Sequence, residues 1–192
     1  MRSWNSILQE HIGTSALCVV LIASLVLNVY LAKQVRTYGK YTRPYPLLKV
    51  NASVPPSFPV EDVNGRELTI AFADDQRPTV LYILSPLCGW CKRNESNMLA
   101  VNDAAMSRFR FIGLSVDSTN LKQYVADRRE PFPVYLLRSK EVIEKFGLYG
   151  TPETIVVSPS AKVMHLWQGA YLAGNRKQIE QFFNVVLPTA TQ

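Results

Sequence analysis

The stretch Ser85-Pro86-Leu87-Cys88-Gly89-Trp90-Cys91-Lys92-Arg93 contains two cysteines that are separated by two residues. The residues before it, 79–84, are almost wholly apolar and β-forming, which is typical of a buried strand in a parallel sheet. After Cys91, polar and apolar residues recur at helical spacing, and the inner face is expected to hold Met98, Leu99, Val101 and Met106. The pattern therefore predicts that the cysteine pair joins the carboxyl end of a strand to the first turn of a helix.

Such a position favours a negative charge, because the first backbone N–H groups of a helix are unpaired and the helix dipole points there. A thiolate carries that charge and is the nucleophilic form of cysteine, and Lys92 and Arg93 add positive charge nearby. Half of a zinc site, completed by Cys18 or a histidine, and a pair of inert buried cysteines are the alternatives. A C-x-x-C pair beside a strand–helix pattern favours a redox dithiol.

The charge of the 192-residue chain is unevenly distributed. From residue 54 onward there are 15 Lys and Arg against 14 Asp and Glu, whereas residues 1–53 hold 6 Lys and Arg and one Glu. A nearly neutral globular part argues against a nucleic-acid partner. The basic residues that follow the most apolar stretch are better suited to lipid head groups.

Residues 14–32 carry no formal charge and would span roughly 28 Å as a helix, close to the thickness of a bilayer core. They are expected to form an uncleaved transmembrane anchor after a short tail, 1–13; the alternative is a cleaved signal peptide, but Tyr30 occupies a position where cleavage requires a small residue. The positive charges that follow the span would, taken alone, leave the globular part in the cytoplasm. This rule weakens when a long domain follows the span.

A basic linker is expected over 33–53 and a single globular domain over 54–192. Asn64-Gly65 predicts a hairpin turn between two short strands. The remaining strands are expected at 110–116, 132–136, 154–157 and 162–167, and the remaining helices at 121–129, 141–146 and 175–187. Strands that alternate with helices predict an α/β fold with a mixed central sheet covered by helices on both faces.

Gly150-Thr151-Pro152-Glu153-Thr154 lies about sixty residues beyond the cysteines and directly before an expected strand. A proline that opens a strand removes one ladder hydrogen bond. The cysteine pair after one strand and Thr151-Pro152 before a later one resemble the thioredoxin fold. With the anchor, the hairpin and the Gly-x-Pro-Glu-Thr pattern, the chain resembles the membrane-anchored thiol-disulfide oxidoreductases of the TlpA/ResA/DsbE group, whose DsbE branch serves cytochrome c maturation.

The resemblance implies a role for each matching residue. Cys88 would be the attacking nucleophile, and Cys91 would resolve the mixed disulfide. Pro152 would be cis and lie against the cysteines, while the backbone of Thr151 would pair with an extended substrate. Glu153 would tune the thiols, and no cofactor beyond a redox-active Cys88–Cys91 disulfide is implied.

The chain also departs from its relatives near the cysteines. Thioredoxins have a buried Asp where this chain has Tyr82, and many relatives have Glu where it has Asn94. Glu95 comes one residue later, about 100° around the helix. Glu95 and Glu153 are therefore the candidate proton-transfer groups, with a water molecule as the alternative. The dipeptide Gly89-Trp90 would shape the site, with Trp90 capping it, meeting a partner or shielding Cys91.

The expected function is membrane-tethered reduction of disulfides in extracytoplasmic proteins, with apocytochrome c as one candidate substrate. A membrane electron donor would reset the dithiol, and the domain would face the periplasm or outer side of the inner membrane. A copper metallochaperone that uses Cys88, Cys91 and His165 is the alternative from a different class. A peroxidase is a third option, although the residues before Cys88 do not supply the Thr and Pro that would frame its single cysteine.

Overall fold

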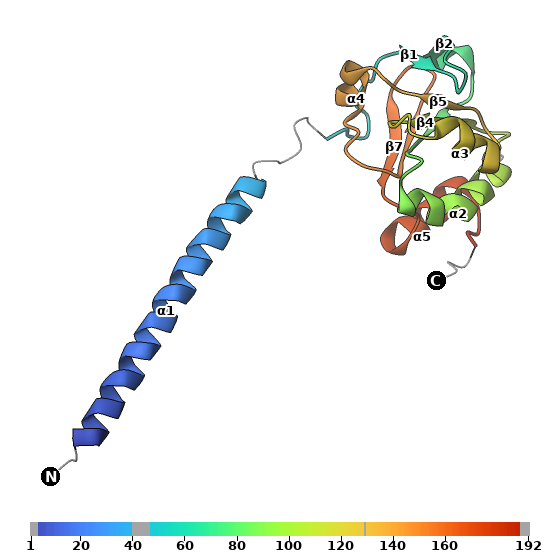
Figure 1. The fold of residues 1–192 in the computed structure, drawn as a ribbon. Helices are drawn as coiled ribbons and strands as arrows, with labels where there is room; N and C mark the ends of the chain where they lie inside the picture. The colour runs from blue at the N-terminus through green and yellow to red at the C-terminus, as the bar shows by residue number, and fades with distance from the viewer. Residues whose placement is uncertain (1–3, 40–46, 129, 189–192) are drawn as a thin grey trace. The chain divides into compact units, whose positions relative to one another are not determined.

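A computed structural model describes the backbone of residues 4–39, 47–128 and 130–188 (Figure 1). The chain divides into two units, Met1–Pro44 and Tyr45–Gln192. Each unit is described by itself below.

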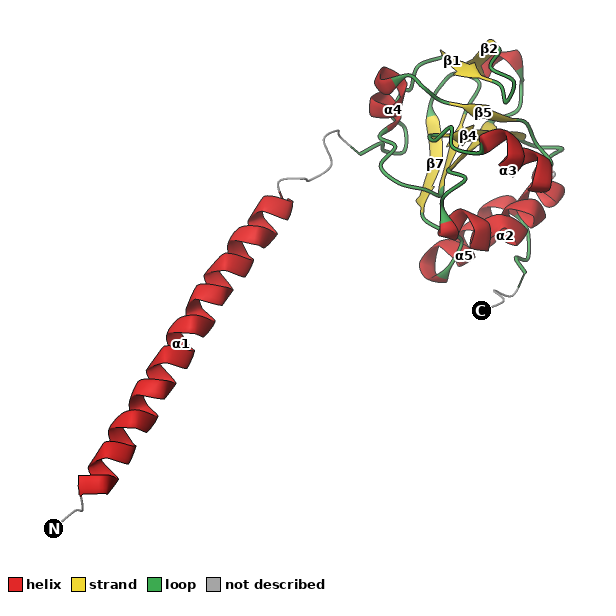
Figure 2. Cartoon of the chain, in the orientation of Figure 1, coloured by secondary structure: helices red, strands yellow, loops and turns green. Residues whose placement is uncertain are grey.

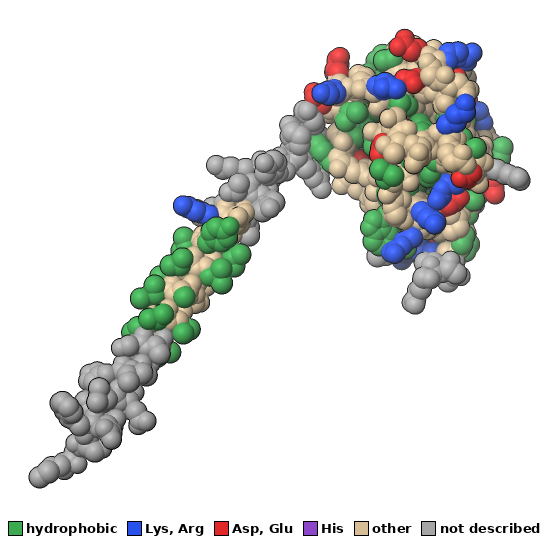
Figure 3. Space-filling view, viewed as in Figure 1, with side chains coloured by type: hydrophobic (Ala, Val, Ile, Leu, Met, Phe, Trp, Pro, Cys, Tyr) green, Lys and Arg blue, Asp and Glu red, His purple; other side chains and the backbone are tan. Residues whose placement is uncertain are grey.

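The first unit contains one long helix, α1 (Trp4–Gly39). Its stretch Leu17–Gln34 is long and apolar enough to cross a membrane, and none of this stretch is buried in the protein. Apolar side chains cover the described part of α1 in Figure 3. The helix continues beyond the expected span at both ends, so residues 4–13 of the expected tail and 33–39 of the expected linker are helical. Residues 1–3 and 40–46 of these two segments lie outside the described residues.

The second unit is built on a seven-stranded sheet with the strand order β2-β1-β5-β4-β3-β6-β7 (Figure 2). The strands are β1 (Ser57–Glu61), β2 (Glu67–Ala71), β3 (Thr79–Leu84), β4 (Arg110–Ser115), β5 (Val134–Leu136), β6 (Glu153–Val157) and β7 (Val163–Gln168). β3 pairs with β4 in parallel and with β6 in antiparallel orientation, and all of its residues are buried. The predicted mixed sheet is thus confirmed.

Helices lie on both faces of this sheet because alternate residues of β3 point to opposite sides. Tyr82 and Leu84 belong to a core cluster that also includes side chains of α2 (Gly89–Ala105), α3 (Leu121–Arg128) and α5 (Ala173–Phe183). Leu81 and Ile83 belong to a second cluster with side chains of α4 (Lys140–Phe146) and of the 3-10 turn η1 (Phe72–Asp74). Figure 2 shows α2 and α5 side by side.

Two details of the helices differ from the prediction. Met106 is 57% exposed, because α2 ends at Ala105 and Met106 is its C-cap. The inner face instead includes Met98, Val101 and Ala105. The last helix, α5, stops at Phe183 rather than continuing to 187, because the C-cap Asn184 has the left-handed φ of 53°.

Residues 51–54, expected to lie in the linker and at the domain boundary, are attached to the sheet. Asn51 N donates to Val163 O (2.8 Å), Val163 N donates to Ala52 O (2.9 Å), and Val54 N donates to Ala161 O (3.0 Å). The register pairs Thr79 with Val157 and Val157 with Val163, so these bonds lie level with the start of β3. The cysteines follow the other end of β3.

Candidate active site

The cysteine pair lies where the sequence predicts, between β3 and α2. The turn after β3 is closed by a bond from Cys88 N to Ser85 O (3.0 Å) and by one from Leu87 N to Ser85 Oγ (3.2 Å). Cys88 has an extended backbone and is the N-cap residue of α2. Its sulfur therefore occupies the place where Ser or Asp oxygens usually cap a helix.

The two sulfurs differ in their surroundings. Cys88 Sγ accepts a hydrogen bond from Cys91 N (3.1 Å) and lies 3.3 Å from Thr151 O. Cys88 is partly exposed, whereas Cys91 is only 1% exposed. The Thr151–Pro152 peptide is cis, as the resemblance implied, and Pro152 is buried. The fold thus brings together Cys88, Cys91 and Thr151-Pro152.

These surroundings separate the acidities of the two thiols. Burial raises the pKa of Cys88, but hydrogen bonds with Cys91, Thr151 and the Trp90 backbone outweigh it, so the net pKa is lowered. Burial, followed by the hydrogen bond with Cys88, raises the pKa of Cys91 to about 12. Since only the thiolate is a good nucleophile, Cys88 is the better attacking group of the two.

The rim of the site is apolar and exposed. Leu87 is 66% exposed and Trp90 is 51% exposed, and the guanidinium of Arg93 lies 4.9 Å from the centre of the Trp90 ring. A Cβ atom at Gly89 would meet no other atom within 4 Å. The open side of the Cys88 turn is therefore available to a partner, and Trp90 lies at the surface of the domain.

The two carboxylates expected to serve the thiols have different environments. Glu95 forms an ion pair with Arg128 of α3. Glu153 is buried in β6 directly after Pro152, opposite Ile83. By strand alternation it shares a face with Ile155 in the second core cluster, whereas the dithiol helix covers the other face.

Asn94, which replaces the glutamate of many relatives, is fully buried and links three elements. Its Oδ1 accepts hydrogen bonds from Tyr171 N (2.8 Å) and Asn97 Nδ2 (3.2 Å), and its Nδ2 donates to Tyr82 OH (3.4 Å). The departures at positions 82 and 94 are thus one connected network. Tyr82 and Asn94 are 12 residues apart and lie on different elements, so no sequence periodicity predicts their hydrogen bond.

A second group of polar side chains joins α2 to α3, and of its members the sequence had indicated only Glu95. Arg128 forms the ion pair with Glu95, and its guanidinium also lies 4.6 Å from the centre of the Tyr124 ring. Tyr124 packs against the core cluster that contains Cys91, and Glu130 follows α3 with a half-buried side chain. Arg128 lies in the last turn of a predicted helix, where a positive charge is favourable, but nothing in the sequence connects it with Glu95.

The copper alternative required the side chains of Cys88, Cys91 and His165 to form one group, and the structure does not bring them together. His165 pairs with Val156 in the sheet. Its ring stacks on Trp167 with ring centres 5.3 Å apart and lies tilted against Phe182 with ring centres 4.2 Å apart. Among the described residues, no three His, Cys, Asp or Glu side chains form a group that could hold a metal ion. The alternative prediction of a copper site formed by Cys88, Cys91 and His165 is therefore wrong for the part of the chain that the structure describes.

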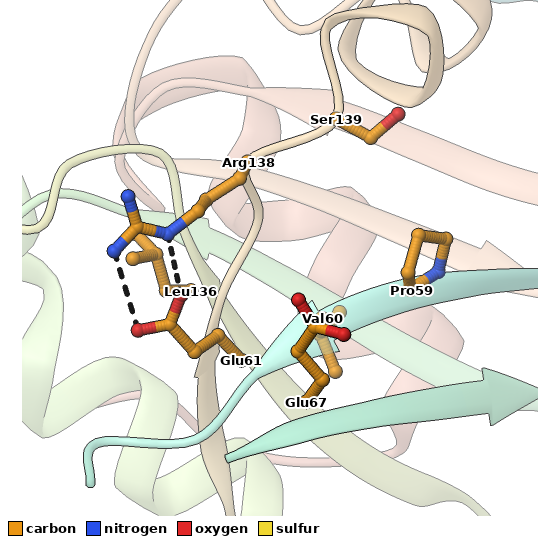
Figure 4. Close-up of a pocket in the computed structure, with 7 residues that line it drawn as sticks. All are labelled: Pro59, Val60, Glu61, Glu67, Leu136, Arg138 and Ser139. Carbon is orange, nitrogen blue, oxygen red and sulfur yellow. Dashed lines mark hydrogen bonds and ion pairs between the residues drawn. The ribbon is translucent and has the colours of Figure 1, made fainter. Parts of the chain in front are cut away.

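A separate pocket of about 180 Å³ lies between β1 and the end of β5 (Figure 4). The guanidinium of Arg138 binds both carboxylate oxygens of Glu61 there, from Nε (2.5 Å) and Nη2 (3.2 Å). The residues that line it include neither cysteine nor any other predicted site residue. The pocket is therefore distinct from the candidate active site.

Comparison with known proteins agrees with this geometry. No curated protein matches the sequence. Two solved structures illustrate the fold: the thioredoxin domain of a thiol-disulfide oxidoreductase from Bacteroides vulgatus (21% identity, 71% of this chain and 99% of that one, TM-score 0.57) and a thiol:disulfide interchange protein of the thioredoxin family from Chlorobium tepidum (22%, 70% and 98%, 0.54). A second Chlorobium tepidum protein, described as a thiol:disulfide interchange protein DsbE, gives 16% identity, 71% and 97% coverage and a TM-score of 0.58. The AhpC/TSA family matches residues 52–166, more than half of the chain. The chain therefore belongs to the AhpC/TSA family and has the thioredoxin-like fold that the sequence predicted.

Proposed function

We propose that this chain is a membrane-tethered thiol-disulfide oxidoreductase that reduces disulfides of extracytoplasmic proteins. The observation that carries the proposal is the position of Cys88 Sγ, which caps α2, receives the Cys91 N–H at 3.1 Å and lies 3.3 Å from the Thr151 carbonyl. A partly exposed sulfur with a lowered pKa beside a buried sulfur with a raised pKa is the asymmetry that a dithiol reductase requires.

The reaction proceeds in two balanced steps. The Cys88 thiolate attacks one sulfur of the substrate disulfide, so that a mixed disulfide forms and the first substrate thiolate leaves. Cys91 then loses its proton and attacks Cys88 Sγ, which releases the second substrate thiolate. The substrate gains two electrons and becomes a dithiol, while Cys88 and Cys91 are oxidised to a disulfide.

Thr151 and the apolar rim hold the substrate in place for the first step. The backbone of Thr151 is next to the reacting sulfur, so an extended substrate segment can pair with it while its cysteine reaches Cys88. Leu87 and Trp90 provide apolar contact area beside that segment. Apocytochrome c is the substrate suggested by the resemblance to the DsbE branch.

The helix α1 serves as the anchor, with the domain on the periplasmic or outer side of the inner membrane. Tethering keeps the oxidised dithiol at a high effective concentration near a membrane electron donor that resets it. A reporter fused after residue 192 tests the orientation. Activity that requires export is expected, and activity found only in the cytoplasm overturns this location.

The enzymatic proposal is tested with full-length protein in mild detergent, using Cys18→Ser as the background so that only the two domain thiols remain. Reduction of insulin by dithiothreitol is expected to accelerate with this background protein. Adding Cys88→Ser abolishes the acceleration, and adding Cys91→Ser instead traps mixed disulfides that mass spectrometry detects. No acceleration by the background protein, or no adduct with Cys91→Ser, overturns the proposal.

A further inference from the structure

Asn28 places a carboxamide inside the apolar stretch of α1. It belongs to Leu17–Gln34, the part of the helix that is long and apolar enough to cross a membrane. It lies six residues before the end of this stretch, which is about 9 Å along the axis at 1.5 Å per residue. The side chain is exposed, and it is too short to extend from this depth to the membrane surface. In a bilayer its polar atoms therefore require hydrogen-bond partners within protein.

Its own helix satisfies this carboxamide only in part. Nδ2 of Asn28 donates to Ser24 O at 2.9 Å, and its second contact, with Ser24 Oγ, is 3.5 Å long, at the limit of a hydrogen bond. A carboxamide has two N–H donors and an oxygen that accepts two bonds. Both contacts use Nδ2, so within the described part of α1 the Oδ1 acceptor and one weakly held N–H are left for a partner outside the helix.

The position of Asn28 on the helix indicates how such a partner would lie. Alternating steps of four and three residues mark one line along α1, which we call the seam: Leu17, Leu21, Ser24, Asn28 and Leu31. This spacing is the 3.5-residue repeat of two helices that wind around each other. Because all faces of this stretch are largely apolar, the leucines do not identify the seam. It is identified by Ser24 and Asn28, which lie on the same face one turn apart.

Both polar residues of the seam suit a helix–helix contact. In the heptad that begins its d positions at Leu17, Asn28 occupies an a position, where a single asparagine fixes the register of a two-stranded pair. Ser24 occupies a d position, and its small side chain lets two helix backbones approach closely. Amide side chains also form hydrogen bonds between helices in membranes.

A second copy of this chain is the partner that fits the carboxamide best. An amide is self-complementary, because the N–H of one can bond to the oxygen of the other in both directions at once. Two identical helices related by a twofold axis place their asparagines at the same depth without any further requirement. Copies that are inserted in the same orientation can meet only as parallel helices.

We propose that two copies of this chain associate through the seam as a parallel, in-register pair of α1 helices. Asn28 of each copy donates from Nδ2 to Oδ1 of Asn28 in the other copy, while the bond to Ser24 O within each helix is kept. The opposite face of α1, which includes the exposed Val19 and Val26, remains in contact with lipid. Both domains of the pair then lie on the same side of the membrane.

Disulfide cross-linking of the full-length chain tests the geometry. Cys18, Cys88 and Cys91 are replaced by serine, one cysteine is introduced, and the purified protein is placed in vesicles of phosphatidylcholine and phosphatidylglycerol and oxidised with copper phenanthroline. Leu21→Cys and Leu31→Cys are each expected to give a covalent dimer on a non-reducing gel, because only a parallel, in-register pair brings both positions next to their own copies. Val19→Cys and Val26→Cys, on the opposite face, are the matched controls and should give little dimer.

A second substitution tests the carboxamide itself. In the Leu21→Cys protein, Asn28→Leu is expected to raise the protein-to-lipid ratio needed for half-maximal cross-linking at least about fivefold. Asn28→Gln keeps a carboxamide and should retain part of the association. Val29→Leu, at the neighbouring position outside the seam, should behave as the parent.

Three outcomes overturn the inference. Equal cross-linking at the seam and at the opposite face would show that contact between the helices is random. An unchanged ratio in Asn28→Leu would show that the carboxamide does not hold the pair. No covalent dimer in any variant would exclude a second copy and assign Asn28 to a different membrane protein. None of these results bears on the dithiol function, because both domain cysteines are absent from the protein tested.

Discussion

Asn94→Ala is expected to destabilise the domain strongly, because this side chain satisfies groups from three elements inside the core. It is fully buried, and its Oδ1 accepts from the Tyr171 backbone N–H at 2.8 Å and from Asn97 Nδ2 at 3.2 Å. Its Nδ2 donates to Tyr82 OH at 3.4 Å, which is near the limit of a hydrogen bond. Truncation to alanine removes all three bonds and leaves their partners buried.

The size of the effect follows from these groups. A stranded buried donor costs about 1–3 kcal/mol, and the Tyr171 N–H has no flexibility with which to find a new partner. The Asn97 amide, also buried, adds about 1 kcal/mol. The higher helix propensity of alanine offsets roughly 0.5 kcal/mol of this loss in the free energy of unfolding. The free energy of unfolding is therefore expected to fall by about 1.5–3.5 kcal/mol.

Urea denaturation of the full-length protein in detergent measures this change, because Trp167 is buried beside α5 and its fluorescence reports unfolding. Ser96→Ala, at an exposed position of the same helix, is the matched control and should lie within about 0.5 kcal/mol of the parent. A loss below about 1 kcal/mol in Asn94→Ala would refute the view that this network holds α2 to the sheet.

Three further results are expected. Gly113→Ala should lower the free energy of unfolding by about 1–3 kcal/mol in urea titrations, because the added methyl would lie 2.9 Å from a side-chain carbon of β5; full stability would contradict this packing. Since the pKa of Cys88 is lowered, its alkylation by iodoacetamide should reach half its maximal rate below pH 9, while Cys91 stays unmodified in the folded protein; equal labelling measured by mass spectrometry would contradict the assignment. Tyr171→Phe should cost about 1–2 kcal/mol in the same titrations, because its hydroxyl is bonded to the buried Thr154 hydroxyl at 2.7 Å, and an unchanged midpoint would argue against that bond.

The framework of the fold could be predicted from sequence because its signals are local. An apolar run such as 79–84 predicts a buried strand when a helical pattern follows it. The turn residues Asn64-Gly65 also predict the hairpin, and Gly147 predicts the end of the helix before it. Each of these elements is in the structure within a few residues of its predicted bounds.

Element ends were predicted less well because they depend on tertiary context. Met106 fits the apolar spacing of α2, but the helix ends one residue before it, and the side chain remains in solvent. Residues 51–53 were predicted to belong to the linker because they have no strand pattern of their own. Residues 51–54 form hydrogen bonds with Ala161 and with Val163 at the start of β7, more than a hundred residues away in the chain.

Some residues of the candidate site could likewise be predicted from the sequence, and others could not. The cysteine pair and Thr151-Pro152 are motifs, so the sequence alone identified them. The Asn94 network and the Glu95–Arg128 ion pair consist of residues that become neighbours only when α2, α3 and the sheet pack together.

The attachment of residues 51–54 has a mechanical consequence. Tension on the incoming chain is borne by the bonds of Asn51, Ala52 and Val54 with the segment 161–163. That segment is level with the beginning of β3, a full strand length from the turn that carries Cys88. A force applied through residue 51 therefore acts on the sheet at the end opposite the turn that carries Cys88.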